Sequence, residues 1–438
     1  MAAESPRNIL LLVIDDLGWA DVGAYNPATF YETPSIDALA ASGMRFTDGY
    51  AASPVCSPTR YSILTGRYPT RAGVTNDFNG TRQGRSGAVA ARYAPALARD
   101  HMPTEELTIA KALQQAGYRT FFAGNWPAAQ GFDINRGADH TYRLAEETVS
   151  FVRTSRSQPF FAMLSFNDVH TPLVAPPELV EKYERKLADD TELHALPDFM
   201  PEEQVWPTEE PRRVRVLQSH AVYAAMVEAM DIAVGRVLEE IDALGLRDTT
   251  AIFFVSDNGG LSTAEGSPTS NLPLRGGKGW LYEGGIREPF IARIPGITKP
   301  GSTSAVAVLT TDLYPTFLDL AQAPPRPQQH LDGSSLLAVL RGGELSREAL
   351  YWHYPHYSNQ GGFPGGAVRV GRYKLLERYE DGRVHLYDLE HDLMELHDLA
   401  RSQPERVAAL RSKLHAWYDE VGARFLGSIE GGPTPWAP

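Results

Sequence analysis

Cysteine is almost absent from this chain, since Cys56 is the only one among 438 residues. A single thiol cannot form a disulfide within the chain, and it supplies too few thiolates for a structural zinc site. Most lone cysteines pack as small buried apolar residues, and this is the plain interpretation of Cys56. Its neighbours, in the segment Cys56-Ser57-Pro58-Thr59-Arg60, favour a chemical role instead.

Positive charge is also scarce. The chain has 41 lysines and arginines against 54 acidic residues, a net charge of -13, and no basic run or stripe. This excludes general binding to nucleic acid or to anionic membranes, but an anionic substrate can still bind where basic groups gather in a cleft. The sequence leaves the oligomeric state open.

Long apolar runs are missing as well. No stretch reaches the length of a transmembrane helix, and residues 9–14 are too few and lack the cleavage pattern of a secretory signal. We therefore expect a cytoplasmic protein that does not bind membranes. A signal trimmed from the sequence would make it an exported one.

Strand and helix patterns alternate over the first three quarters of the chain. Continuous apolar runs at 8–14, 160–165 and 250–256 are typical of parallel strands covered on both faces. Helices are expected between them, at 34–42, 105–116, 143–156 and 212–244. These patterns predict an α/β fold with a doubly wound, mostly parallel sheet, in a catalytic domain of residues 1–325.

The pattern of expected strands and helices changes after a proline-rich stretch at 324–327. Short strand patterns at 367–370, 373–376 and 384–387 precede a helix expected at 404–425. We predict a smaller C-terminal α+β subdomain, residues 326–438, with an antiparallel sheet and one helix.

Two pairs of polar residues follow predicted strands. Asp15 and Asp16 come directly after the first strand, and Asp257 and Asn258 come directly after the strand expected at 250–256. Either pair alone is typical of loop or capping chemistry. Ligands bind beyond the carboxyl ends of strands in open parallel sheets, and adjacent carboxylates are stabilised by a hard divalent cation. Together the pairs predict a calcium or magnesium site rather than a zinc site.

The Cys56 segment predicts a short helix. Pro58 fits the first turn of a helix expected from Thr59 to Leu64, which Gly66 would end. Cys56 would then lie at the positive end of the helix, with Arg60 within one turn. This arrangement favours chemistry on an anion.

Two further basic residues stand in loops. Lys278 lies in Gly276-Gly277-Lys278-Gly279, where glycines allow close approach to an anion, although the spacing is not that of a P-loop. His170 follows the strand expected at 160–165 and is a candidate acid, base or anion donor. Each alone is more typical of a solvated loop.

The segment Cys56-Ser57-Pro58-Thr59-Arg60, continued by Leu64-Thr65-Gly66-Arg67, resembles the signature of the formylglycine-dependent sulfatases of the alkaline phosphatase superfamily. The resemblance covers nearly the whole chain. Its other motifs, in chain order, are Asp15-Asp16, Gly117-Tyr118-Arg119-Thr120, Ser256-Asp257-Asn258-Gly259, Gly277-Lys278-Gly279, Glu283-Gly284-Gly285, Asp312-Leu313-Tyr314-Pro315-Thr316, Leu331-Asp332-Gly333, Gly371-Arg372-Tyr373-Lys374-Leu375 and Leu386-Tyr387-Asp388-Leu389.

The resemblance implies that a formylglycine-generating maturation enzyme oxidises Cys56 to an aldehyde, which hydrates to a geminal diol. One hydroxyl would attack sulfur and the alcohol would leave. Deprotonation of the other hydroxyl would then release sulfate and restore the aldehyde without attack of water on sulfur. The substrate would be a sulfate monoester of a small molecule or oligosaccharide, a sulfated carbohydrate or an aryl sulfate.

The resemblance also implies roles for individual residues. Arg60 would stabilise the diol or alkoxide, while Lys278 and His170 would bind the sulfate and help the leaving group. Calcium (Ca²⁺), in preference to magnesium (Mg²⁺), would be held by Asp15, Asp16, Asp257 and Asn258, with the product of Cys56 also near the metal.

One departure concerns residues 125 and 127. The family usually has Gly-Lys-Trp-His where this chain has Gly124-Asn125-Trp126-Pro127. Asn125 can donate a hydrogen bond to a substrate but carries no charge, and Pro127 offers no side-chain donor. A weakly active or inactive sulfatase-like protein is therefore an alternative. A phosphate or phosphonate ester hydrolase of the same superfamily is another.

His356 stands in Trp352-His353-Tyr354-Pro355-His356-Tyr357, which resembles a segment that approaches the site from the smaller domain in carbohydrate sulfatases. Contact with substrate and a packing role are both open for it.

Overall fold

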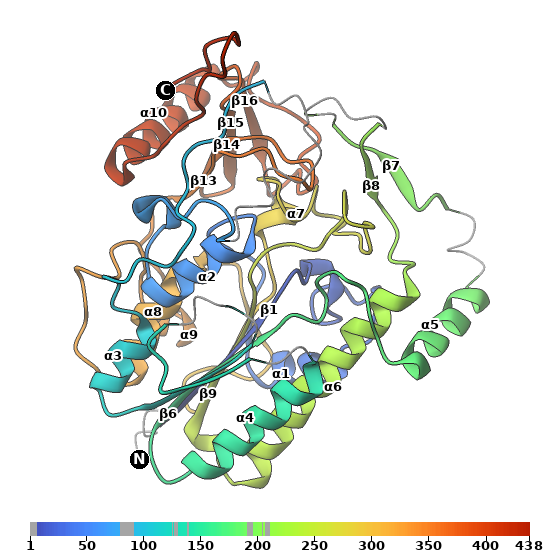
Figure 1. Cartoon of the computed structure of the whole chain (residues 1–438), viewed down its shortest axis with the longest axis vertical. Helices are drawn as coiled ribbons and strands as arrows, with labels where there is room; N and C mark the ends of the chain where they lie inside the picture. The colour runs from blue at the N-terminus through green and yellow to red at the C-terminus, as the bar shows by residue number, and fades with distance from the viewer. Residues whose placement is uncertain are drawn as a thin grey trace.

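A mostly parallel sheet runs through the centre of the computed structural model, which describes residues 7–78, 92–124, 126, 130–137, 140–190, 196–203, 205 and 211–438 (Figure 1). Its eight described strands have the order β11-β2-β10-β9-β1-β6-β4-β5. Their bounds are β1 Asn8–Ile14, β2 Met44–Phe46, β4 Arg119–Ala123, β5 Ile134–Arg136, β6 Phe160–Phe166, β9 Thr250–Ser256, β10 Phe290–Arg293 and β11 Ser302–Ser304. The only antiparallel neighbours among them are the pairs that β10 forms with β9 and β2.

Helices cover both faces of this sheet, because alternate side chains of its central strands point to opposite sides. In β1, Leu10, Leu12 and Ile14 enter one core, and Ile9, Leu11 and Val13 enter the other. The first core lies under α1 Pro34–Ser42, α4 Thr141–Ser155 and α6 Ala221–Ala243, with α5 Pro177–Asp189 against α6; the second lies under α2 Cys56–Thr65, α3 Ile109–Gln115, α8 Leu313–Leu320 and α9 Leu337–Leu340.

The C-terminal part forms its own antiparallel sheet, β13 Leu350–Tyr354, β14 Gly365–Val370, β15 Tyr373–Arg378 and β16 Val384–Asp388. Helix α10, Pro404–Val421, packs against β14 and β15 at the red end of the chain (Figure 1). The fold class predicted from the sequence is thus confirmed. Tyr50, Trp280 and Tyr282 share the core of this part, and the predicted boundary between residues 325 and 326 stays a prediction.

The remaining described strands and one four-residue α-helix lie outside these two sheets. They are the parallel pair β3 Gly49–Tyr50 and β12 Val308–Leu309, the antiparallel pair β7 Phe199–Pro201 and β8 Arg213–Arg215, and α7 Glu283–Ile286. None of the described helices is both long enough and apolar enough to cross a membrane.

Four predicted helix boundaries were wrong. The helix expected at 404–425 already ends at Val421, because Gly422 follows it in the left-handed conformation. Residues 213–215 form β8 and the long helix starts only at Ala221, where the His220 side chain accepts a hydrogen bond from the Tyr223 amide. The helix expected from residue 105 starts at Ile109, because Thr108 caps it. Helix α2 begins at Cys56 rather than Thr59, since a proline is tolerated in a first turn.

Candidate active site

The site lies where three neighbouring parallel strands end. Ile14, the last residue of β1, pairs with Phe166 of β6 and Ser256 of β9. The residues that follow these strands therefore meet at one edge of the sheet. The Asp16 amide donates to Asp257 Oδ1 at 3.2 Å, and Asp16 has a φ of 62°, a left-handed conformation that aspartate tolerates better than most residues.

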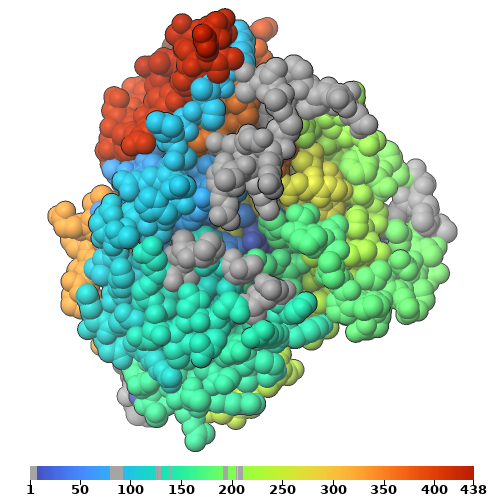
Figure 2. Space-filling model, viewed as in Figure 1, coloured from blue at the N-terminus to red at the C-terminus, as the bar shows by residue number. Residues whose placement is uncertain are grey.

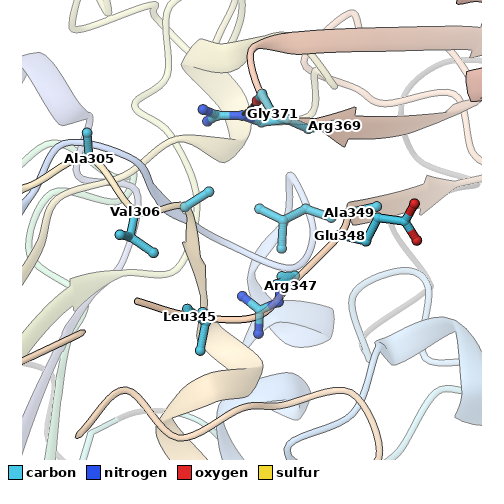
Figure 3. A pocket seen from close by; sticks show the side chains of 10 residues that line it. Ala305, Val306, Leu345, Arg347, Glu348, Ala349, Arg369 and Gly371 are labelled. Atoms are coloured by element: carbon cyan, nitrogen blue, oxygen red, sulfur yellow. Dashed lines mark hydrogen bonds between the residues drawn. The ribbon is translucent and has the colours of Figure 1, made fainter. Parts of the chain in front are cut away.

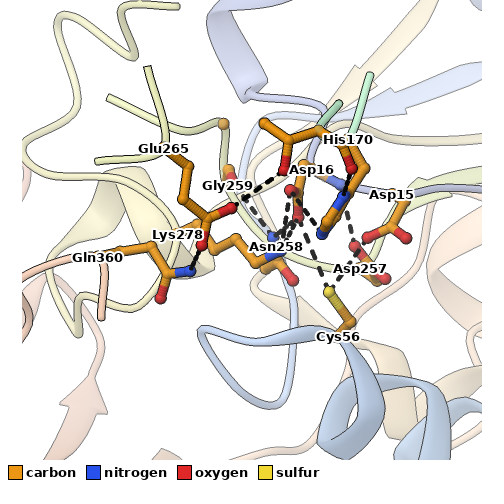
Figure 4. Close-up of polar contacts among 12 residues, drawn as sticks. Asp15, Asp16, Cys56, His170, Asp257, Asn258, Gly259, Glu265, Lys278 and Gln360 are labelled. Carbon is orange, nitrogen blue, oxygen red and sulfur yellow. Dashed lines mark hydrogen bonds and ion pairs between the residues drawn. The ribbon is translucent and has the colours of Figure 1, made fainter. Parts of the chain in front are cut away.

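Cys56 is the first residue of α2 and faces this edge. Its Sγ lies 3.1 Å from Asp15 Oδ1 and 3.8 Å from Asp16 Oδ1 (Figure 4). The helix behind it is buried, and Gly66, with a φ of 68°, ends it in the left-handed conformation that glycine adopts without strain. Helix α2 thus presents residue 56 to two carboxylates.

Arg60, one turn further along α2, bridges two of the acidic residues. Its Nε donates to Asp257 Oδ2 at 2.7 Å, and its Nη2 lies 2.9 Å from Asp15 Oδ2. All three side chains are almost fully buried. Burial alone would raise the pKa of Asp15, but the positive charges of Arg60, His170 and Lys278 together outweigh it and hold this pKa below its ordinary value.

Two more cationic groups converge on Asp16. The buried Lys278 Nζ lies 2.7 Å and 2.8 Å from its two carboxylate oxygens, and His170 Nε2 lies 3.7 Å from Oδ2. Burial would lower the pKa of Lys278, but the surrounding negative charges, Asp16 first among them, together raise it well above its usual value. Asp16 also raises the pKa of His170. Proximity to Asp16 thus favours the charged form of both side chains beside Cys56.

The hydrogen bond of the other ring nitrogen orients His170. Its Nδ1 lies 2.6 Å from the carbonyl oxygen of Thr171. Because a carbonyl only accepts, Nδ1 carries a proton in this contact, and Nε2 is the nitrogen that faces Asp16 and the site.

We call Asp15, Asp16, Asp257 and Asn258 the acidic cluster, and its donor atoms fit a hard divalent cation. Ligand atoms of its three aspartates and of Cys56 all lie within 4.8 Å of one another. The buried Asn258 Oδ1 accepts no hydrogen bond from the described residues, while its Nδ2 donates to Asp16 at 2.7 Å. Burial and the charge of Asp15 raise the pKa of Asp257 to about 7. A bound cation would relieve this repulsion and give Asn258 Oδ1 a partner.

The structure brings together most of the residues singled out in the sequence: Asp15, Asp16, Cys56, Arg60, His170, Asp257, Asn258 and Lys278 (Figure 4). His356 is fully buried, with Nε2 2.9 Å from Thr75 Oγ1, and its contact with substrate stays a prediction. Asn125 and Pro127 lie outside the described residues.

Sequence reasoning missed two acidic residues near the site. Asp77 Oδ1 accepts the Ser57 amide at 3.2 Å, which satisfies a free donor in the first turn of α2. Glu265 accepts hydrogen bonds from the loop that carries His170 and from the C-terminal part. Both stand in loops without a recognisable motif, so no local signal could have identified them.

The structure also contains a cavity that lies away from the candidate site. Figure 2 shows dark-blue atoms of the N-terminal segment at the centre of the face, between teal and yellow segments. A cavity of about 260 Å³ lies elsewhere, at the seam between residues 305–307 and the C-terminal part (Figure 3). Its arginines, Arg347 and Arg369, are paired with Asp312 and Asp48. None of the predicted site residues lines it.

Comparison with known proteins gives consistent results along the whole chain. The family model described as Sulfatase matches residues 7–145 and 127–323, and the one described as N-sulphoglucosamine sulphohydrolase, C-terminal, matches residues 277–421. Arylsulfatase A of Homo sapiens is 32% identical over 418 residues, covering 88% of this chain and 77% of the relative. A sulfatase of Formosa agariphila is 29% identical over 524 residues, covering 95% and 89%.

Solved structures agree with this. The crystal structure of Ps i-CgsB in complex with k-i-k-neocarrahexaose matches with a TM-score of 0.75 and 26% identity, covering 94% of this chain and 92% of that one.

Proposed function

Because this chain belongs to the sulfatase family and is an enzyme of that family, we propose that it hydrolyses a sulfate monoester through a formylglycine made from Cys56, with calcium in the acidic cluster. The observation that carries this proposal is the position of Cys56. Its Sγ lies at the start of α2, 3.1 Å from Asp15, on the edge where Lys278 and His170 also point. A hydroxyl in place of the thiol would have an acceptor there.

The two absent groups would supply the nucleophile and the charge that activates it. Conversion of Cys56 by a maturation enzyme supplies a hydrated aldehyde, with one hydroxyl to attack sulfur and a second whose deprotonation expels sulfate and restores the aldehyde. Calcium, held by the oxygen donors of the acidic cluster, supplies a positive charge that lowers the pKa of a neighbouring hydroxyl.

The chain's own residues bind the sulfate group and donate the proton to the leaving oxygen. Lys278 Nζ and His170 Nε2 are the donors that a sulfate group would meet, since both already lie on Asp16 at the site. With its Nδ1 proton held by Thr171, His170 can give the Nε2 proton to the leaving oxygen. Arg60 holds Asp15 and Asp257 in place and offsets their charge.

For the substrate we propose a sulfated carbohydrate. The names of two similar proteins support this class. One is an N-acetylgalactosamine-6-sulfatase, and the other is Ps i-CgsB, solved in complex with k-i-k-neocarrahexaose. We keep Asn125 and His356 as proposed substrate contacts. Loss of charged donors at 125 and 127 predicts slower turnover than in enzymes that retain both.

The test compares hydrolysis of an aryl sulfate with that of the matching aryl phosphate, using protein co-expressed with a formylglycine-generating enzyme. We expect turnover of the sulfate, loss of it in Cys56→Ala, and the mass of formylglycine at position 56 in the digested protein. Equal turnover by Cys56→Ala, or an unmodified thiol in fully active protein, would contradict the mechanism. Preference for the phosphate would favour the other ester class.

A further inference from the structure

Glu265 joins three loops at the edge of the site. It lies between β9 and α7, and its Oε2 accepts from Thr171 Oγ1 at 3.2 Å. Its Oε1 accepts from Asn359 Nδ2 at 2.6 Å. The same oxygen accepts from Gln360 Nε2 at 2.9 Å (Figure 4). Its φ is 53°, an unfavourable value for glutamate that persists only where the surroundings hold it. A carboxylate with three donors on two other loops provides such surroundings.

One branch of these contacts leads to His170. Thr171 follows His170 directly, and its carbonyl oxygen accepts from His170 Nδ1 at 2.6 Å. The position of Thr171 therefore sets both the tautomer and the ring orientation of the histidine. Glu265 fixes Thr171 through its hydroxyl.

The other branch leads to Lys278. Gln360 Oε1 accepts from Ser358 Oγ at 2.6 Å, and the loop 358–362 packs on Gly279, the residue after the lysine. A Cβ on Gly279 would lie 2.0 Å from Ser358 Oγ, and a Cβ on Gly362 would lie 1.7 Å from the Gly279 carbonyl oxygen. The backbone at Gly279, next to Lys278, thus has no room to shift toward this loop.

We propose that Glu265 is a positioning residue that holds His170 and Lys278 at the separation that a sulfate group requires. In this role it makes the C-terminal loop 358–362 a part of the active site. The proposal rests on the proposed function, because it assigns to these two side chains the binding of sulfate. Charge-assisted hydrogen bonds to a carboxylate are strong enough to keep three loops in fixed positions relative to one another.

The test uses Glu265→Leu, Glu265→Gln and Thr171→Val, assayed with an aryl sulfate and with a sulfated sugar. For Glu265→Leu we expect kcat to fall about 10–100-fold on both substrates, because misplacement of a catalytic donor by about 1 Å has this effect. Glutamine keeps one acceptor oxygen, so Glu265→Gln is expected to recover kcat to within about threefold of the wild type. Thr171→Val is expected to lower kcat, and its effect should not add to that of Glu265→Leu.

Glu380→Leu is the matched control, since Glu380 accepts from Tyr357 at 2.6 Å beside the same loop but contacts neither branch. It should leave kcat unchanged. A wild-type kcat in Glu265→Leu, or equal losses in the leucine and glutamine variants, would overturn the proposal. So would a loss confined to the sugar substrate, which would indicate direct contact with the sugar.

A second measurement separates this proposal from the proposed function. Calorimetric binding of inorganic sulfate needs no turnover, and we expect Glu265→Leu to weaken it about tenfold while Glu380→Leu does not. If the wild type turns over no sulfate ester, the proposed function fails. The sulfate affinities would still decide the role of Glu265, and equal affinities would refute it.

Discussion

At the scale of single residues, Asp16 contacts both the acidic cluster and the basic residues of the site. Its carboxylate accepts from Lys278 and Asn258, and His170 and Cys56 lie close to it. Burial, with the added charge of Asp15, raises its pKa even though Lys278 and His170 lower it. A metal ion bound here would compete with Lys278 for Asp16, which would leave the ammonium group available to an anionic substrate.

The first prediction concerns Asn258. Because its buried Oδ1 has no hydrogen-bond donor among the described residues, Asn258→Ala should weaken calcium binding at least about tenfold in a calorimetric titration. The matched control is Asn8→Ala, since Asn8 is a buried asparagine at the opposite end of β1. Equal calcium affinities of the two variants would remove Asn258 from the metal site.

At the scale of elements, two helices are capped by carboxylates from elsewhere in the chain. Helix α1 has no side-chain cap from Thr33, and Asp231 of α6 accepts the Ser35 and Ile36 amides at 3.0 Å and 2.9 Å. Asp77 does the same for Ser57 at the start of α2. Free amides at helix starts are thus satisfied by tertiary contacts, which fix where each helix begins relative to the sheet.

The second prediction is a pH dependence that comes from Asp231. Burial raises its pKa from 3.8 to about 6, despite the hydrogen bonds from Ser35 and Ile36. Its contribution to stability is therefore complete below about pH 4 and is lost as the pH rises through 6, a change of about 3 kcal/mol. The asparagine of Asp231→Asn does not titrate. In urea unfolding, the free energy of unfolding of this variant should therefore fall less between pH 4 and pH 7 than that of the wild type. If the free energy of unfolding changed equally with pH in the wild type and the variant, Asp231 would not have a raised pKa.

At the scale of the whole molecule, a buried ionic cluster joins the C-terminal sheet to the catalytic part. Lys374 of β15 lies 2.9 Å from Glu283 of α7 and 3.0 Å from Glu395, and all three are fully buried. Tyr50 donates to the other oxygen of Glu283 at 2.6 Å. Since α7 closely follows Lys278 in the chain, this cluster keeps the C-terminal sheet in a fixed position relative to the site.

The third prediction is that Lys374→Met destabilises the protein by about 3–5 kcal/mol, because it leaves the buried Glu395 without its cation and Glu283 with only Arg287, 3.3 Å away. Urea or thermal unfolding measures this. Lys413→Met is the control, since Lys413 pairs with the exposed Glu348 on the surface and should change stability by less than about 1 kcal/mol. Similar stabilities of the two variants would mean that the cluster does not hold the parts together.

Local sequence patterns determined the fold class and most members of the site. The apolar runs of β1, β6 and β9 predict buried parallel strands, and parallel strands bring the residues after them to one edge. The pairs Asp15-Asp16 and Asp257-Asn258 follow from this alone, whereas Cys56 was identified from its own segment and the resemblance of that segment to the sulfatase signature. The pattern did not predict β13, and it extended the helix of α6 through β8, because helix propensity carries no information on where a distant partner interrupts it.

Only the tertiary structure decided which partners each side chain has. Lys278 and His170 share Asp16, although the lysine is 262 residues away from it in the chain. Glu265 connects the loops of both, and Asp77 caps the helix of Cys56. Such contacts depend on loops that close over long stretches of chain, and no local pattern encodes the partner at the far end. The sequence by itself therefore determined which chemical groups are present, whereas the fold decided how they are oriented toward a substrate.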